Sequence, residues 1–170
     1  MKTPIIEKIT AANGSVICHA KIEGTLRVIF LGETLARVTW QPTDGFLEPV
    51  TWAIYPCGTN SKQNASSGVA RSQVDSIITA ERPFLATNFP INEKGDTMLT
   101  TKAVSVSVTS NPLRLLWSDT SSGETILADR ETSAYFFEKR TGGIRHYLFR
   151  DKKDYYYGLG DKTGTPINTV

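Results

Sequence analysis

The sequence predicts an all-β protein, an antiparallel β-sandwich with few or no helices that forms a single domain over residues 1–170. Two observations support this fold class. Short segments alternate apolar and polar residues with period two, and frequent turns rich in Gly, Pro, Asn and Ser separate them. In addition, no segment carries a sustained apolar stripe of period 3.6, which a packed helix would need. A chain of 170 residues suits one domain and can bury a core without metals or many disulfides.

The first predicted strands lie within residues 15–40. The segment "SVICHAKIE", which begins at Ser15, alternates apolar and polar residues. The segment "GTLRVIFLGETLARVTW" alternates on both sides of the polar link "LGET", and this predicts a β-hairpin. Neighbouring residues of a strand face opposite sides, so Cys18 and His19 are not expected to form a catalytic pair.

Residues 41–96 are less regular. The segment "PTDGFLEP" has turn chemistry, "VTWAIYP" is a short apolar run that ends at Pro56, and polar residues 57–73 predict a long exposed loop. The segment "VDSIITAE" is compatible with either a strand or a short helical turn. The segment "RPFLATNFPINEKGD" contains two prolines and is not expected to be helical.

The pattern becomes clear from about Thr100 onward. Val104, Val106 and Val108 alternate with Ser and Thr, which predicts a half-buried strand. The tripeptide "SNP" then turns the chain, and "LRLLW" begins a return strand. Further strands are predicted in "TILAD", "SAYFFEK" and "IRHYLFR", with turns at "SDTSSGE" and "RTGG".

The composition argues against two classes of partner. The 19 basic and 17 acidic residues give a net charge of +2, and the basic residues are scattered, so nucleic-acid binding is not expected. No stretch approaches the ~20 apolar residues of a membrane span. The start "MKTPIIEKIT" has no apolar run typical of a signal peptide, so a cytoplasmic location is favoured.

The cysteines do not indicate a metal site or a cofactor. Cys18 and Cys57 lie far apart and have no Cys or His neighbours at metal-ligand spacing. Two buried thiols are favoured over a disulfide. Glycosylation triplets at Asn13 and Asn64 matter only if the protein is secreted.

The titratable residues give no clear catalytic arrangement. His146 alternates with its neighbours in "IRHYLFR", and this predicts a structural strand residue. Asp151, Asp154 and Asp161 are the local candidates for the paired carboxylates of sugar chemistry, but interleaved lysines favour a solvated turn. None of these three carboxylates lies in an apolar run where burial would raise its pKa. The segment "GLGDKTG" lacks the spacing of a phosphate-binding loop.

Three consecutive tyrosines form the most distinctive surface candidate. At least one of Tyr155, Tyr156 and Tyr157 must face away from the core if the segment is extended. Such a side chain suits an interface, or stacking against a sugar ring.

The segments "VSVSVTSNPLRLLW", "ILADR" and "GGIRHYLFRDKKDYYYGLGDKTG", in this order and spacing, resemble the N-terminal domain of glycoside hydrolase family 31. This is the family of α-glucosidases, α-xylosidases and α-glucan lyases. The resemblance covers residues 103–164, and "TLRVIFLGETLARVTW" resembles the early strand pair of the same domain more loosely. Residues 41–96 do not align by eye. The chain departs from the pattern where relatives continue "TGPLNR", because it has "TGTPINTV".

The resemblance implies a galactose-mutarotase-like β-sandwich that precedes a catalytic (β/α)8 barrel acting on α-linked glucosides or xylosides. The family's catalytic aspartates lie in that barrel, and no position of this sequence matches their motif. The chain is therefore expected to be inactive alone, and residues 155–170 resemble the start of the junction to the absent barrel. Asp161 and Lys162 would be the residues nearest the substrate, and contacts with the barrel at the interface would explain them as well. Exposed interface surface predicts self-association or poor solubility.

Two other functions remain open. A stand-alone carbohydrate-binding or protein-interaction module would use Tyr155, Tyr156 and Tyr157 as its binding face. An aldose epimerase, suggested by fold analogy only, would need a histidine and a carboxylate that converge on the sugar, and only His19 and His146 are available.

Overall fold

A computed structural model describes residues 2–21, 24–43, 50–51, 69–70, 85–138, 143–151 and 153. Within these ranges all regular structure is β-strand, which confirms the predicted fold class. The strands are β1 (Ile6–Ala12), β2 (Ser15–Ala20), β3 (Thr25–Phe30), β4 (Ala36–Gln41), β5 (Val50–Thr51), β6 (Val69–Ala70), β7 (Thr87–Asn88), β8 (Thr97–Thr100), β9 (Val104–Ser110), β10 (Leu113–Asp119), β11 (Thr125–Ala128), β12 (Tyr135–Glu138) and β13 (Gly143–His146).

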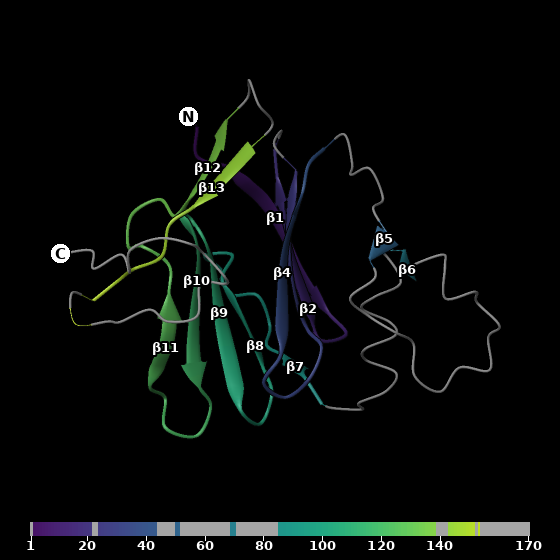
Figure 1. Ribbon diagram of the computed structural model, residues 1–170, viewed down its shortest axis with the longest axis vertical. Helices are drawn as coiled ribbons and strands as arrows, with labels where there is room; N and C mark the ends of the chain where they lie inside the picture. Colours follow the sequence, from purple (N-terminus) through teal and green to yellow (C-terminus); the bar gives the residue numbers. More distant parts are fainter. Residues whose placement is uncertain are drawn as a thin grey trace, which may run out of the picture.

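Two antiparallel sheets form the layers of the sandwich (Figure 1). The first sheet has the order β1-β2-β3-β4, and the second has the order β11-β10-β9-β8-β7. Two further pairs, β12-β13 and β5-β6, are separate two-stranded sheets. Because consecutive strands are paired throughout both main sheets, the chain builds each layer mostly by successive hairpins.

The predicted hairpin in the first sheet is confirmed as β3 and β4. Leu26, Val28 and Phe30 of β3 are fully buried, as their shared parity predicted. In β4, which ends the sheet order, Val38 pairs with Val28 but remains 42% exposed. The alternation in β4 therefore predicted a strand correctly. Val38 is nevertheless partly open to solvent, because β4 has a strand partner on one side only in the described part of the chain.

The second sheet confirms the strand and return strand predicted after Thr100. Val106 and Val108 of β9 are fully buried, and Val108 pairs directly with Leu115 of β10. Leu113 and Leu115 also face the core, at 1% and 2% exposure. Because serines and Thr109 occupy the other face of β9, this sheet is apolar toward the core and polar on its outer side near β9.

The core lies between the two sheets, where their apolar faces meet. The ring of Phe30 packs edge-on against Trp117 at a centroid distance of 6.1 Å. The buried cluster comprises Ile9, Val16, Cys18, Leu26, Val28, Phe30, Leu99, Val106, Val108, Leu113, Leu115, Ala134 and Tyr135. Polar contacts also join the layers, because the Thr101 hydroxyl donates to the Glu33 carbonyl at 2.6 Å.

Several strands were not predicted from the sequence. The strands β1, β7 and β8 lie in segments for which no strand was expected, and β6 falls inside the predicted loop of residues 57–73. That loop prediction is wrong at Val69 and Ala70, which pair with Thr51 and Val50. The ambiguous segment "VDSIITAE" and Cys57 lie outside the described residues.

The two neighbouring leucines of β10 allow a direct test of the layer assignment. Leu115→Ala is expected to lower the free energy of unfolding by about 2–5 kcal/mol, because it leaves a cavity between the sheets. Leu116→Ala, one residue away and 38% exposed, is expected to cost much less. Urea unfolding of both variants measures this, and equal losses would contradict the assigned faces of β10.

The buried thiol of Cys18 predicts a loss of stability at alkaline pH. Burial raises the pKa of Cys18 from 9.0 to about 12. The unfolded chain therefore releases the thiol proton first as the pH rises above 9.0, and the free energy of unfolding falls across the window up to about 12. Cys18→Ala is expected to flatten this fall. Urea unfolding of the wild-type chain and the variant at a series of pH values tests this prediction. The same dependence of the unfolding free energy on pH in both proteins would refute it.

Candidate functional site

The site residues predicted from the sequence lie outside the described part of the chain. This applies to Tyr155, Tyr156, Tyr157, Asp161 and Lys162. Their proposed contacts with an interface or a sugar therefore stay predictions.

Among the other titratable candidates, Asp154 lies outside the described residues, and Asp151 and His19 each have a local partner. The Asp151 carboxylate is exposed and accepts a hydrogen bond from the Lys153 backbone N–H at 2.9 Å, as in a solvated turn. His19 faces away from the buried Cys18, and its Nε2 lies 3.4 Å from the Thr10 hydroxyl. Neither residue takes part in a catalytic arrangement in the described structure.

Asp129 is the polar residue that the sequence analysis missed. It follows β11 directly, and its side chain is only 1% exposed, although the sequence gave no sign that a carboxylate is buried here. Its Oδ2 accepts the Leu115 backbone N–H at 2.8 Å, and its own N–H donates to the Leu115 carbonyl at 2.9 Å. The side chain of Asp129 therefore takes the place of a backbone acceptor at the end of the β10-β11 ladder.

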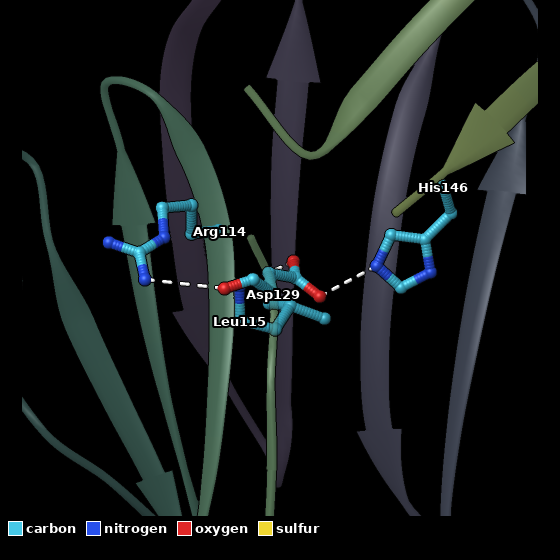
Figure 2. Close-up of polar contacts among 4 residues, drawn as sticks. All are labelled: Arg114, Leu115, Asp129 and His146. Atoms are coloured by element: carbon cyan, nitrogen blue, oxygen red, sulfur yellow. Dashed lines mark hydrogen bonds and ion pairs between the residues drawn. The ribbon is translucent and has the colours of Figure 1, made fainter. Parts of the chain in front are cut away.

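His146 contacts the other oxygen of the same carboxylate. Its Nε2 lies 2.6 Å from Asp129 Oδ1, and Figure 2 shows Asp129 between Leu115 and Arg114 on one side and His146 on the other. As predicted, His146 is a strand residue, since it ends β13. It is 38% exposed, so one side of the ring faces solvent while Nε2 reaches a buried partner.

Tyr135 completes this group, which we call the Asp129 cluster: Asp129, His146, Tyr135, Leu115 and Arg114. Tyr135 pairs with His146 across β12-β13, and the two rings stack at a centroid distance of 4.4 Å. Burial, and secondarily the nearby Asp129 carboxylate, raise the pKa of Tyr135 well above its usual value. The Arg114 guanidinium donates to the Asp129 backbone carbonyl at 3.3 Å. The cluster thus joins β10, the end of β11 and the β12-β13 hairpin.

The segment that follows β13 runs along the same edge. Asp129 and Leu148 form an antiparallel bridge, the Phe149 N–H donates to the Ala128 carbonyl at 2.8 Å, and the Arg130 N–H donates to the Tyr147 carbonyl at 3.1 Å. The Arg130 guanidinium also lies 4.9 Å from the centre of the Tyr147 ring. We call residues 147–149 the exit segment, because they lead the chain away from the last strand.

The Asp129 cluster has half of a catalytic arrangement. A carboxylate that orients a histidine is typical of nucleophilic catalysis, but the histidine must then activate a nucleophile. The Cys18 thiol is buried, and its raised pKa keeps it protonated and unreactive near neutral pH. Among the residues that the structure describes, no group of three His, Cys, Asp or Glu side chains is arranged to bind a metal.

A separate hollow lies where β1 begins and β9 ends. It has a volume of about 270 Å³ and is lined by residues 3–6, residues 110–112 and Ser133. None of these lining residues is ionisable. The hollow therefore offers no acid or base to a ligand, and the Asp129 cluster is best explained as a structural junction.

A comparison with protein families gives the identity of the domain. The model of the glycosyl hydrolase 31 N-terminal galactose mutarotase-like domain matches residues 25–166. The chain belongs to this family. The match includes residues 41–96, which did not align by eye, as well as the segments that suggested the resemblance. A comparison with curated proteins finds no match. In the described ranges no helix is long and apolar enough to cross a membrane.

The chain's two histidines provide a matched test of the Asp129 cluster. His146→Ala is expected to lower the free energy of unfolding by about 1–3 kcal/mol, because it leaves a buried carboxylate oxygen without its partner. His19→Ala removes only a long, partly exposed contact and is expected to cost less than about 0.5 kcal/mol. Urea unfolding near neutral pH measures both, and comparable losses would show that the short contact to Asp129 contributes no special stability.

Proposed function

We propose that this chain is the non-catalytic N-terminal β-sandwich domain of a retaining α-glycosidase, in which it supports a linked catalytic (β/α)8 barrel. The observation that carries the proposal is the family match over residues 25–166. As the resemblance implies, the family's catalytic aspartates belong to the barrel, and the described part of this chain contains no arrangement that replaces them. The proposed parent reaction is the hydrolysis of α-linked glucosides or xylosides.

An exposed apolar patch supports a domain interface on the outer face of the second sheet. The patch consists of Leu116, Ile126, Tyr147 and Phe149, which are 38%, 58%, 38% and 55% exposed. Ala128 pairs with Leu116 on one side and lies opposite Phe149 on the other, so Leu116 and Phe149 share one face. Ile126 lies two residues before Ala128, at the register shift between β10 and β11. Contiguous apolar surface of this kind is typical of interaction sites.

The position of the patch favours the catalytic barrel as the partner that covers it. Two of its four residues belong to the exit segment, which leads directly to the residues that resemble the junction with the barrel. The outer face is polar further from this edge, where Ser105, Ser107 and Thr109 of β9 lie. A barrel attached after the exit segment would reach the patch without crossing the polar part of the sheet.

The substrate-bordering role of this domain is part of the same proposal. Asp161 and Lys162 follow the "YYYGLG" segment and would lie nearest the sugar bound in the barrel, while Tyr155, Tyr156 and Tyr157 would fill the interface. No cofactor is needed for such a role. The runner-up is a stand-alone carbohydrate-binding or protein-interaction module, for which the apolar patch would be the binding face.

Two measurements on the purified chain separate these functions. Chromogenic α-glucosides and α-xylosides are expected to show no turnover, and calorimetric titration with maltooligosaccharides is expected to show no binding. Turnover would refute the proposal that the catalytic groups belong to a barrel. Measurable affinity for the oligosaccharides would favour the stand-alone module.

The patch also predicts how the isolated chain behaves in solution. We expect concentration-dependent self-association, because the barrel-facing surface is left open to water. A chain with both Ile126→Ser and Phe149→Ser is expected to associate less and to bind less of a hydrophobic dye. Ile5→Ser, at an exposed apolar residue outside the patch, is the control. Light scattering measures association, and a wild-type chain that stays monomeric at high concentration would contradict the assignment.

A further inference from the structure

The turn between β1 and β2 contains the dipeptide Asn13-Gly14 in an unusual local environment. Asn13 is exposed and has a φ of 50°, and Gly14 has a φ of 69°, so both residues of this two-residue turn are left-handed. Asn-Gly is the dipeptide that such hairpin turns favour. The same dipeptide is also the one in which an asparagine side chain is most open to attack by the following backbone nitrogen, because Gly has no side chain in the way.

Asn88 of the opposite sheet holds this turn with two hydrogen bonds. The Gly14 backbone N–H donates to Asn88 Oδ1 at 2.9 Å, and Asn88 Nδ2 donates to the Ser15 carbonyl at 2.9 Å. Asn88 lies in β7 of the second sheet, which Figure 1 shows near the end of the sandwich where β2 begins. One amide side chain therefore ties the first hairpin to the other layer.

We propose that Asn13 is a site of spontaneous deamidation, and that the hydrogen bond from Gly14 to Asn88 suppresses the reaction in the folded domain. This modification is independent of the proposed role beside a catalytic barrel. It requires no enzyme and no reactant other than water.

The reaction proceeds by ring closure at the turn. The Gly14 nitrogen loses its proton to solvent base and attacks Cγ of Asn13, the new N–Cγ bond forms, and the Cγ–Nδ2 bond breaks as Nδ2 takes up a proton and leaves as ammonia. Water then opens the succinimide ring at either carbonyl. One opening gives aspartate, and the other gives isoaspartate, in which the backbone runs through the former side chain.

The hydrogen bond to Asn88 opposes the first step in two ways. The Gly14 N–H donates its hydrogen bond to Asn88 Oδ1, so solvent base cannot remove the proton until that contact opens. The same contact fixes the left-handed conformation of the turn, which must change for the nitrogen to reach Cγ. Because Asn88 belongs to the other sheet, ring closure requires a local separation of β7 from the β1-β2 turn.

The isoaspartate product would disturb the hairpin that the turn sets up. Ala12 and Ser15 are paired directly across the two-residue turn. An extra methylene in the backbone lengthens the turn and changes the path that this pairing requires. The register of β1 against β2, which places Ile9 and Val16 in the core, depends on that pairing.

The test follows deamidation of Asn13 by peptide mass spectrometry during incubation in mildly alkaline buffer. The folded wild-type chain is expected to deamidate more slowly than the same chain unfolded in urea, by about tenfold or more. Asn88→Ala is expected to accelerate the reaction several-fold in the folded state, while Asn88→Asp, which keeps an acceptor for the Gly14 N–H, is expected to stay closer to wild type. Asn111 precedes proline and cannot close the ring by this route, so it is the internal reference.

A second variant separates the local contact from a general loss of stability. Asn92, in the connection between β7 and β8, is also an amide side chain that accepts backbone N–H groups, those of Lys94 and Asp96. Asn92→Ala is expected to leave the Asn13 rate unchanged. If it accelerates the reaction as much as Asn88→Ala does, the proposed protection by Asn88 is wrong. Equal rates in folded and unfolded wild-type chain, which need no variant to fold, would overturn it as well.

Discussion

The buried carboxylate of Asp129 is the constraint around which the C-terminal part of this domain is arranged. A carboxylate that is removed from water is strongly unfavourable unless hydrogen bonds compensate for the lost hydration. Here the Leu115 N–H and the His146 ring supply those bonds from β10 and from β13. The two strands must therefore approach the end of β11 together, and the hairpin that carries His146 is fixed against the sandwich by chemistry more specific than apolar packing.

This constraint has consequences for the surface as well as for the core. His146 is followed directly by the exit segment, whose backbone continues the antiparallel pairing alongside Ala128 and Arg130. Fixing His146 therefore also fixes the direction in which the chain leaves the sandwich and the face on which Tyr147 and Phe149 are exposed. A domain that supports a partner needs its contact surface in a defined position, and a buried polar junction beneath that surface can provide the position.

The sequence predicted the strands well where each strand has one buried face. In β9, Val106 and Val108 face the core and the serines between them face outward. This alternation with period two is visible in the sequence and is enough to identify the strand. Asp129 could not be found in this way. It follows "TILA" as an ordinary strand-ending residue would, and its burial depends on His146, which is seventeen positions away and belongs to another hairpin. The strand β8 was missed because Thr97, one of its two buried residues, is polar, so the segment shows no alternation of apolar and polar residues.

The burial of Asp129 also explains why the Asp129 cluster is suited to a structural role and not to catalysis. A general acid or nucleophile must reach the substrate, whereas Asp129 is 1% exposed and uses both carboxylate oxygens on protein partners. His146 presents an exposed ring edge, but Nε2 is already committed to the carboxylate and the nearest aromatic partner, Tyr135, keeps its proton because burial raises its pKa. What this arrangement can contribute to an enzyme is the fixed geometry of a junction, which fits the non-catalytic role proposed above.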